Sequence, residues 1–255
     1  MSASDIFARS EALLGAVAMK RLAAARVLIV GVGGVGSWCA EALVRTGLGR
    51  ITLVDDDVVA ESNVNRQCPA TSETIGRAKV EAMAERLKAI SPECEVEAVN
   101  ARYPSSSVAR PESFALVVDA IDSVDCKAEL ILGATEAGVP LVSSMGAALR
   151  TDPTKVKVTR FEKVEGDGLA KALRQRFRKL GRWPKGRFSC VWSAEHAIEH
   201  HSGDFASQSD LRSVDISGQS GNRTALRGSL MPVTATFGMC LASEAIKIIT
   251  KGEKE

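Results

Sequence analysis

The sequence predicts an α/β fold, namely a doubly wound, mostly parallel Rossmann-like sheet with a C-terminal insertion and a closing helix. Short apolar runs alternate with amphipathic helical segments through residues 26–150. A glycine-rich turn joins the first run to a helix, and a triplet of aspartates follows the second run. This alternation is typical of a parallel sheet with helices on both faces.

The best-defined unit begins with Val27–Val30, a β-branched-rich run expected of a strand buried on both faces. A helix over Ser37–Gly47 and a second strand over Arg50–Val54 follow. Its glycines are Gly31, Gly33, Gly34 and Gly36, and its acids are Asp55, Asp56 and Asp57. Glycines let backbone amides approach a phosphate at a helix N-terminus, and an acid after the second strand can bind a ribose. The unit predicts a nucleotide site, with a purely structural turn as the alternative.

The spacing of apolar residues predicts the remaining elements. Residues 5–25 predict one or two amphipathic helices. Further helices are predicted over Ala78–Ile90, Ala128–Ala137, Leu169–Leu180 and Thr234–Thr250, and strands over Glu95–Asn100, Phe114–Val118, Val139–Ser143 and Lys155–Phe161. Residues 196–229, rich in Ser, Gly and Asp, predict a long loop.

The domain organisation predicted from this order is a single domain with four parts. The parts are an N-terminal helical segment (1–25), a nucleotide-binding core (26–150), a strand, basic helix and polar loop (151–229), and a C-terminal helix (230–255).

Polar or small residues follow four of the predicted strands. The segments are Gly31–Gly36, Asp55–Asp57, Asp119–Asp122 and Ser143–Gly146. The carboxyl ends of parallel strands meet at one edge of a sheet, and ligands bind beyond that edge. We therefore expect these four segments to form one site.

Composition excludes few functions. The chain has 255 residues, a net charge of +2 and six cysteines, none of them in a C-x-x-C pair, so a structural zinc site is not expected. The N-terminal segment is too charged for a secretion signal, and the apolar stretch Ser229–Ser243 is too short to span a bilayer. We expect a soluble cytoplasmic protein. His196, His200 and His201 could bind a metal by composition, but loop histidines are more often solvated.

The glycine turn and the segment DDDVVAESNVNRQ resemble the ThiF/MoeB/HesA family, bacterial relatives of ubiquitin-activating enzymes, from about Phe7 to Ile249. The resemblance implies that ATP is held by Gly31, Gly33, Gly34, Gly36, Asp55, Asp57, Asn63, Arg66, Lys79 and Asp122. Within this set, Arg66 and Lys79 would act on the phosphates, and Asp122 would hold Mg²⁺. Arg9 would enter the partner's site across a homodimer.

Each of the implied catalytic residues has a plainer interpretation. Arg66 could be a surface ion-pairing residue, Lys79 a solvated charge at a helix start, and Asp122 a helix cap. Arg9 has the least specific sequence context. Cys190 lies where some members carry a cysteine, and its alternative is a small buried residue.

Within the family, the sequence is most similar to the tRNA threonylcarbamoyladenosine dehydratases. The supporting segments are GVGSWCAEALVRTGLGRITLVD, VVDAIDSVDCK, DPTKVKV, LRQRFRKLG, VWSAE and MPVTATFGM. This implies adenylation of a carboxylate by ATP, followed by ring closure in a tRNA nucleoside. An adenylyltransferase acting on a ubiquitin-like sulfur-carrier tail, with a sulfur-transfer protein as partner, is one alternative. An NAD-dependent oxidoreductase and a non-catalytic nucleotide-binding scaffold are the others.

A basic segment bears on the choice between RNA and a protein tail. Residues 171–187 contain eight basic residues and no acid, together with Phe177 and Trp183, which could pack on the core or stack on a base. The predicted tRNA-binding residues are Lys171, Arg174, Arg178, Lys179 and Arg182. The alternative is a solvated helix face.

Overall fold

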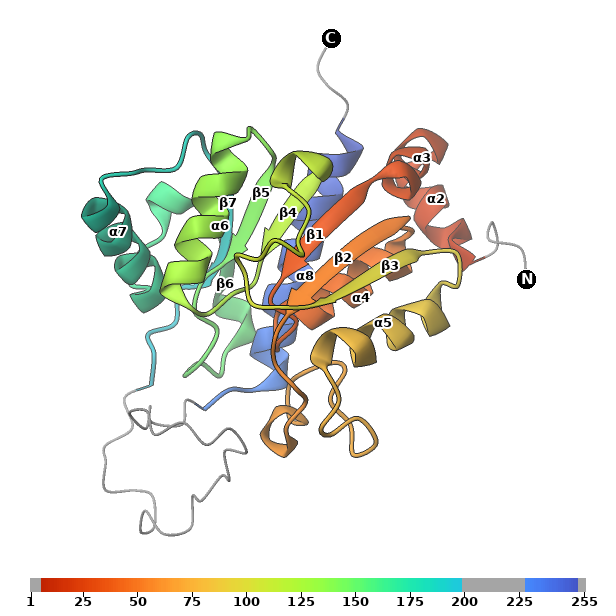
Figure 1. Cartoon of the computed structure of the whole chain (residues 1–255), viewed down its shortest axis with the longest axis horizontal. Helices are drawn as coiled ribbons and strands as arrows, with labels where there is room; N and C mark the ends of the chain where they lie inside the picture. Colours follow the sequence, from red (N-terminus) through yellow and green to blue (C-terminus); the bar gives the residue numbers. More distant parts are fainter. Residues whose placement is uncertain (1–5, 199–227, 252–255) are drawn as a thin grey trace.

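The computed structural model describes residues 6–198 and 228–251. In these ranges, strands form one sheet in the order β3-β2-β1-β4-β5-β7-β6 (Figure 1). The strands are β1 (Arg26–Val30), β2 (Arg50–Asp55), β3 (Glu95–Asn100), β4 (Leu116–Asp119), β5 (Leu141–Ser144), β6 (Val156–Arg160) and β7 (Ser189–Ser193). Neighbouring strands are parallel except for β6, which runs antiparallel to β7. The predicted fold class is confirmed.

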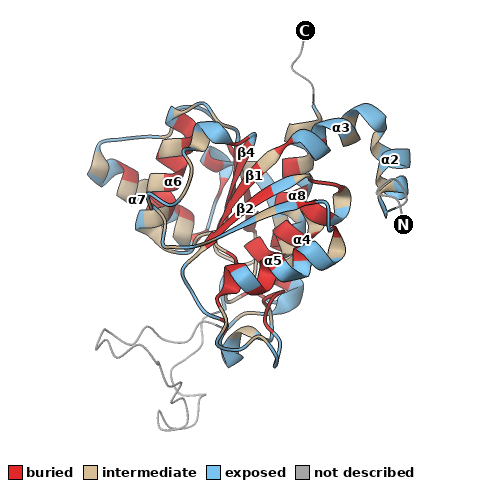
Figure 2. Cartoon of the chain, turned by 45° about the vertical axis from the view of Figure 1, so that its right-hand side comes forward, coloured by how far each residue is buried: buried red, intermediate tan, exposed pale blue. Residues whose placement is uncertain are grey.

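Helices cover both faces of the sheet (Figure 1). One face carries α4 (Gly36–Thr46), α5 (Lys79–Ile90) and α8 (Met231–Thr250), and the other carries α6 (Val124–Glu136) and α7 (Gly168–Leu180). The N-terminal helix α3 (Ala16–Ala24) packs against α8, and α2 (Ala8–Leu14) packs against α3. Short 3₁₀ turns occupy Glu61–Asn63, Pro111–Ser113, Pro153–Lys155 and Phe161–Lys163. Figure 2 shows the buried residues concentrated on the central strands and on the helix faces that meet them.

Strand β1 explains why the two faces form two cores. Successive side chains of a strand point to opposite faces, so Val27 and Ile29 enter the core beneath α4, α5 and α8. Leu28 and Val30 enter the core beneath α6 and α7. Because both faces are covered, the strand is apolar throughout rather than alternating.

The chain reverses direction across the sheet at β1. From β1 it proceeds to β2 and β3 on one side, and it then returns to β4 and β5 on the other. Gly31 follows β1 and lies against the residue that follows β4. Its φ is +94°, and a Cβ there would lie 2.6 Å from the carbonyl oxygen of Ala120. Only glycine fits this crossing, which is where doubly wound sheets bind ligands.

Strand β7 was missed by the sequence interpretation. It consists of Ser189–Ser193, whose only β-branched residue is Val191, and it follows directly on the basic segment. All its residues except Ser189 are buried, and it pairs with both β5 and β6. The segment after residue 150 therefore adds two strands, β7 and β6, to the sheet beyond β5.

Two helix predictions needed correction in detail. Helix α6 begins at Val124 rather than Ala128, so Lys127 belongs to the helix. On α7, the predicted apolar face included Leu169, but Ala170, Leu173 and Phe177 are the buried residues. Phe177 is fully buried and so packs on the core, whereas Trp183 is 51% exposed.

Helix α8 is a core helix that is long and apolar enough, by length and composition, to cross a membrane. Its 20 residues extend well past Ser229–Ser243, the apolar stretch that by itself is too short to span a bilayer. Val233, Phe237 and Leu241 are fully buried in the core shared with α4 and the sheet. Core packing accounts for the apolar composition of α8. Most of the predicted loop 196–229, including His200 and His201, lies outside the described residues.

Candidate active site

The four segments expected to form one site are joined by direct contacts at the carboxyl ends of the strands. The backbone N–H of Val32, after β1, donates to Asp55 Oδ2 at the end of β2, over 2.6 Å. Gly31 lies against Ala120 after β4. Ser143 Oγ on β5 donates to Asp119 Oδ2 on β4, also over 2.6 Å. The ends of four adjacent strands thus form one continuous surface.

The glycine turn presents backbone donors that the described residues leave without acceptors. The N–H groups of Gly33 and Gly34 make no hydrogen bond within that part of the chain. These groups precede the N-terminus of α4, where the helix dipole favours an anion. Ser37 Oγ donates to the Gly33 carbonyl oxygen over 2.6 Å and fixes the turn. The donor set therefore fits a phosphate.

Gly34 lets two other elements close on the turn. A Cβ at Gly34 would lie 3.3 Å from Cγ of Arg66 and 3.4 Å from Cβ of Thr234, at the start of α8. Thr234 could not be identified as a neighbour of the turn from the sequence, because its proximity depends on how α8 packs. The turn therefore lies between the Arg66 segment and α8.

Asp55 shapes the turn as well as standing beside it. Its second carboxylate oxygen accepts the N–H of Asp57 over 2.9 Å. Burial raises the pKa of Asp55, and the positive charge of Lys79 counteracts the rise. A carboxylate offers about four acceptor positions, so two N–H bonds leave capacity for a ribose hydroxyl.

Lys79 is not a solvated charge at a helix start. It is 5% exposed, and its Nζ lies 2.6 Å from Asp57 Oδ2. Its backbone N–H also donates to the Asp57 carbonyl oxygen over 3.0 Å, so the start of α5 is held by the acidic triplet. A buried ammonium needs such a partner. The pair holds the Lys79 charge at the edge of the site.

The carboxylate oxygens of Asp55, Asp56 and Asp57 lie within 4.8 Å of one another, and no other group of three possible metal ligands occurs in the described residues. All six cysteines are free, and none belongs to such a cluster.

Arg66 makes no ion pair with any described residue, which argues against a structural ion-pairing role. Its guanidinium donates to the Ser62 carbonyl oxygen over 2.8 Å and to Asn65 Oδ1 over 2.9 Å. Burial lowers its pKa. Asn63 turns the chain here: its side chain accepts the Ala60 N–H, and its carbonyl accepts the Arg66 N–H. The SNVNR segment thus places beside the glycine turn a cation that has no ion-pair partner among the described residues.

Asp122 is exposed and makes no side-chain hydrogen bond within the described residues. It does not cap α6, whose N-cap residue is Ser123. It stands two residues after Ala120, the residue in contact with Gly31. Its carboxylate is free to bind a ligand at the junction of β1 and β4.

The sequence interpretation overlooked a buried ion pair behind Asp122. Lys127 and Asp119 are both fully buried, with Nζ 2.8 Å from Oδ2. Lys127 also donates to the Ile121 carbonyl oxygen over 3.0 Å, and Asp119 accepts the N–H of Ile121 over 3.2 Å. Burial raises the pKa of Asp119, while Lys127 and Ser143 counteract the rise. The pair therefore holds the loop that carries Asp122. In the sequence, the only sign of this buried pair is that Lys127 directly precedes the apolar run of α6.

A second network ties the Arg66 segment to α4. Glu41 Oε2 accepts from Arg86 Nε over 2.5 Å and from Cys68 Sγ over 2.9 Å, and Arg45 donates to Oε1 over 2.8 Å. The backbone N–H of Cys68 also donates to Ser37 Oγ over 3.1 Å, which adds a second link between this segment and α4. Burial alone would raise the pKa of Glu41, but these donors outweigh burial and hold it at about 2.

We expect Glu41 to make stability depend on acid pH. A carboxylate whose folded pKa is depressed stabilises the fold above its unfolded pKa of about 4.5, and the contribution disappears as pH falls toward 2. The shift corresponds to about 3 kcal/mol. Urea titrations at pH 3 to 7 should show a stability gap between wild type and Glu41→Gln that shrinks below about pH 4.5. A gap that stays constant over this range would contradict the assignment.

Arg9, and the two other residues whose role the sequence leaves open, Cys190 and His196, lie apart from these contacts. Arg9 is exposed on α2, which packs near Gly47 and the start of β2, at the opposite edge of the sheet. Cys190 is fully buried and burial raises its pKa, so it is a small core residue and not a reactive thiol. His196 is exposed.

The basic segment, residues 171–187, contains two kinds of cation. Arg174 donates to the carbonyl oxygens of Phe161 and Val164 over 2.9 and 2.8 Å, and Arg182 pairs with Glu136 over 2.9 Å. Lys171, Arg178 and Lys179 are exposed. Binding of tRNA by this set stays a prediction, and the three exposed cations are the better candidates.

Known proteins resemble the chain over nearly its whole length. A tRNA threonylcarbamoyladenosine dehydratase of Escherichia coli is 39% identical over 253 residues, covering 94% of this chain and 92% of the relative. A tRNA threonylcarbamoyladenosine dehydratase of Bacillus subtilis is 42% identical over 177 residues, covering 69% and 70%. The crystal structure of the E. coli dehydratase in complex with ATP superposes with a TM-score of 0.78 at 36% identity, covering 96% and 94%.

The family model for ThiF proteins matches residues 7–255. That range includes the glycine turn, the SNVNR segment, Lys79 and Asp122, which the fold brings to one edge of the sheet. The chain belongs to the ThiF family.

Proposed function

We propose that the protein catalyses the ATP-dependent dehydration of threonylcarbamoyladenosine in tRNA. The observation that carries the proposal is the gathering, at one edge of the sheet, of Arg66, Lys79 and glycine-turn amides that have no acceptor among the described residues. The similarity to dehydratases over nearly the whole chain supports the choice of substrate.

The chemistry requires activation of a carboxylate. A carboxylate is a poor electrophile because its charge repels nucleophiles and oxide is a poor leaving group. The threonyl carboxylate of the modified adenosine attacks the α-phosphate of ATP, which forms an acyl-adenylate and releases pyrophosphate. The carbamoyl group of the same nucleoside then attacks the acyl carbon, closes a ring and releases AMP. The net change in the nucleoside is the loss of one water.

Phosphoryl transfer needs positioning and neutralisation of charge more than covalent participation. We assign the positive charge to Arg66 and Lys79, and the dipoles to the N–H groups of the glycine turn. Asp55 has the acceptor capacity to bind the ribose, while Asp57 and Asn63 hold Lys79 and Arg66 in place. Asp122, exposed and without a partner among the described residues, would hold Mg²⁺, which would neutralise phosphate charge.

One assay tests the proposal. The purified protein is incubated with ATP, Mg²⁺ and tRNA bearing threonylcarbamoyladenosine, and digested nucleosides are examined by mass spectrometry. We expect a nucleoside lighter by one water, with one AMP formed for each product. If the protein binds NAD and forms no AMP, the proposal is wrong and the alternative of an NAD-dependent oxidoreductase is favoured.

The second candidate is an adenylyltransferase acting on a ubiquitin-like protein tail. The glycine turn, Arg66 and Lys79 suit that chemistry equally well. The cysteines disfavour it, since Cys39, Cys68, Cys94 and Cys190 are buried and none of the six cysteines belongs to a metal-ligand cluster. A sulfur-transfer partner is accordingly not part of our proposal. A cytoplasmic location is part of it, because the proposed substrates are tRNA and ATP.

We also propose a homodimer in which Arg9 completes the partner's site. Arg9 lies at the edge of the sheet opposite to its own site, so it can reach a site only in another copy. Leu13 and Val17 in the same helical pair are 84% and 67% exposed, as expected of a surface that a second copy covers.

Mixing two inactive variants tests Arg9. Random exchange of Arg9→Ala and Arg66→Ala subunits makes half of the dimers mixed, each with one intact site, so about a quarter of wild-type activity should return. Each variant alone, carried through the same exchange protocol, is the control. Failure of the mixture to exceed the separate variants, or a monomer in sedimentation, would dispose of the proposal.

A further inference from the structure

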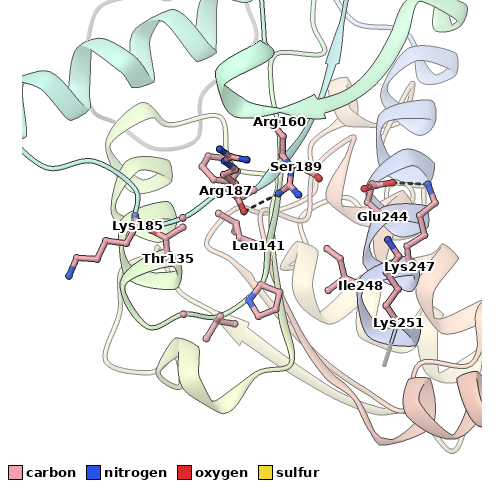
Figure 3. Close-up of a pocket in the computed structure, with 15 residues that line it drawn as sticks. Thr135, Leu141, Arg160, Lys185, Arg187, Ser189, Glu244, Lys247, Ile248 and Lys251 are labelled. Carbon is pink, nitrogen blue, oxygen red and sulfur yellow. Dashed lines mark hydrogen bonds and ion pairs between the residues drawn. The ribbon is translucent and has the colours of Figure 1, made fainter. Parts of the chain in front are cut away.

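A cleft of about 600 Å³ lies at the edge of the sheet opposite to the candidate active site. Its floor is Leu141 at the start of β5 and Ser189 at the start of β7, and its walls come from the end of α6 and the last turns of α8. Figure 3 shows Arg160 and Arg187 together on one side, with Glu244, Lys247 and Lys251 on α8 and its end facing them.

Positive charge dominates the cleft. The five cations of its lining are Arg160, Lys185, Arg187, Lys247 and Lys251, and its one acid is Glu244. Glu244 pairs with Lys247 over 2.7 Å, so it offsets only that cation. Arg160 donates to the carbonyl oxygen of Arg187 over 3.2 Å, which holds the two guanidinium groups on the same wall. Apart from Lys247, these cations make no ion pair with a described residue.

The basic segment connects the active-site edge to this cleft. Four residues before it begins, Asp167 caps α7 and accepts the N–H of Gly146, beyond the carboxyl end of β5, over 3.2 Å. At its end, the N–H of Lys185 donates to Thr135 Oγ1 in the cleft wall, also over 3.2 Å. The 13 residues of α7 between them span about 20 Å. The exposed cations Lys171, Arg178 and Lys179 lie along this path.

We propose that the cleft binds backbone phosphates of the tRNA body while the modified nucleotide occupies the active site at the other edge. The proposal rests on the proposed function and adds a second contact surface to it. The cations are exposed on long side chains and the cleft is open, which suits phosphates that position an RNA rather than a small anion held by buried donors. An RNA chain is long enough to follow the path along α7 between the two edges.

The test compares variants that remove equal charge from different places. Arg160→Gln/Arg187→Gln removes two cations from the cleft. Lys20→Gln/Lys88→Gln removes two exposed cations from α3 and α5, away from the cleft. Glu244→Gln/Lys247→Gln alters the cleft without changing its net charge. Circular dichroism melts establish that all three are folded before binding is measured.

Affinity for full-length tRNA is measured from 50 to 300 mM salt. Each cation that neutralises a phosphate contributes about one unit to the log–log slope, so the cleft variant should lose about two units of slope. Its affinity at low salt should fall several-fold. Both control variants should keep the wild-type slope. A cleft variant that behaves like the α3/α5 control would overturn the proposal and leave the cleft to another polyanion, such as an acidic protein.

Turnover separates this proposal from the proposed function. A short RNA fragment carrying threonylcarbamoyladenosine reaches the active site but not the cleft, so the cleft variant should process it at the wild-type rate while showing a raised KM for full-length tRNA. If the cleft variant and wild type have equal KM values for full-length tRNA, the proposed role of the cleft is wrong, while the proposed dehydratase activity is unaffected. If wild-type protein dehydrates neither RNA, the proposed function fails, and the binding slopes still decide whether the cleft contacts RNA.

Discussion

Lys79→Ala should lower kcat at least about 100-fold while leaving the fold intact, because its charge acts on the phosphates in the transition state. The stability cost should be small. Its partner Asp57 is 67% exposed in its side chain and regains water when the ammonium is removed. We expect Arg66→Ala to lose activity and keep its fold in the same way. Arg66 makes no ion pair with a described residue, so the substitution breaks none.

The measurement is the single-turnover rate of AMP formation at saturating ATP and tRNA, beside a thermal melt of each variant. Lys88→Ala is the matched control, because Lys88 stands exposed in the last turn of the same helix as Lys79. A Lys79→Ala protein that keeps more than about a tenth of the wild-type rate would refute the assignment of Lys79 to the phosphates.

Lys127→Met should be strongly destabilised, by about 3–5 kcal/mol. Methionine keeps much of the length of the side chain, so little cavity forms. The cost arises because the Asp119 carboxylate stays in a fully buried position after losing its counter-ion. In a chain of this size, we expect the melting temperature to fall by roughly 10 °C.

The double variant Asp119→Asn/Lys127→Met is the informative companion. Asparagine removes the buried charge, keeps one oxygen to accept the Ile121 N–H, and can donate its amide N–H to the Ser143 hydroxyl oxygen, so much of the lost stability should return. Urea unfolding of wild type and both variants, run in parallel, measures the difference. If Lys127→Met proves as stable as wild type, the buried pair does not have the energetic role described for it.

The sequence determined those features that depend on residues close together in the chain. A β-branched run, a glycine turn, a helical spacing and an acid after the next strand define a βαβ unit within about 30 residues. The structure confirms that unit almost to the residue, because strand, turn and helix propensities agree there. The same local pattern identifies Gly31 as part of the ligand-binding turn. Its contact with Ala120 could not be predicted, because the two residues are far apart in the chain.

Tertiary structure decided which charged side chains are available. The sequence shows eight cations in residues 171–187 as equals, yet Arg174 is used to bind carbonyl oxygens and Arg182 is paired with Glu136, on α6. The cleft at the opposite edge is formed by segments far apart in the chain, and β7 is buried because β5 and β6 lie on either side of it. The same holds for Lys127, which the fold places against Asp119. Local pattern fixes backbone conformation, but the environment of a charge depends on which distant segments pack around it.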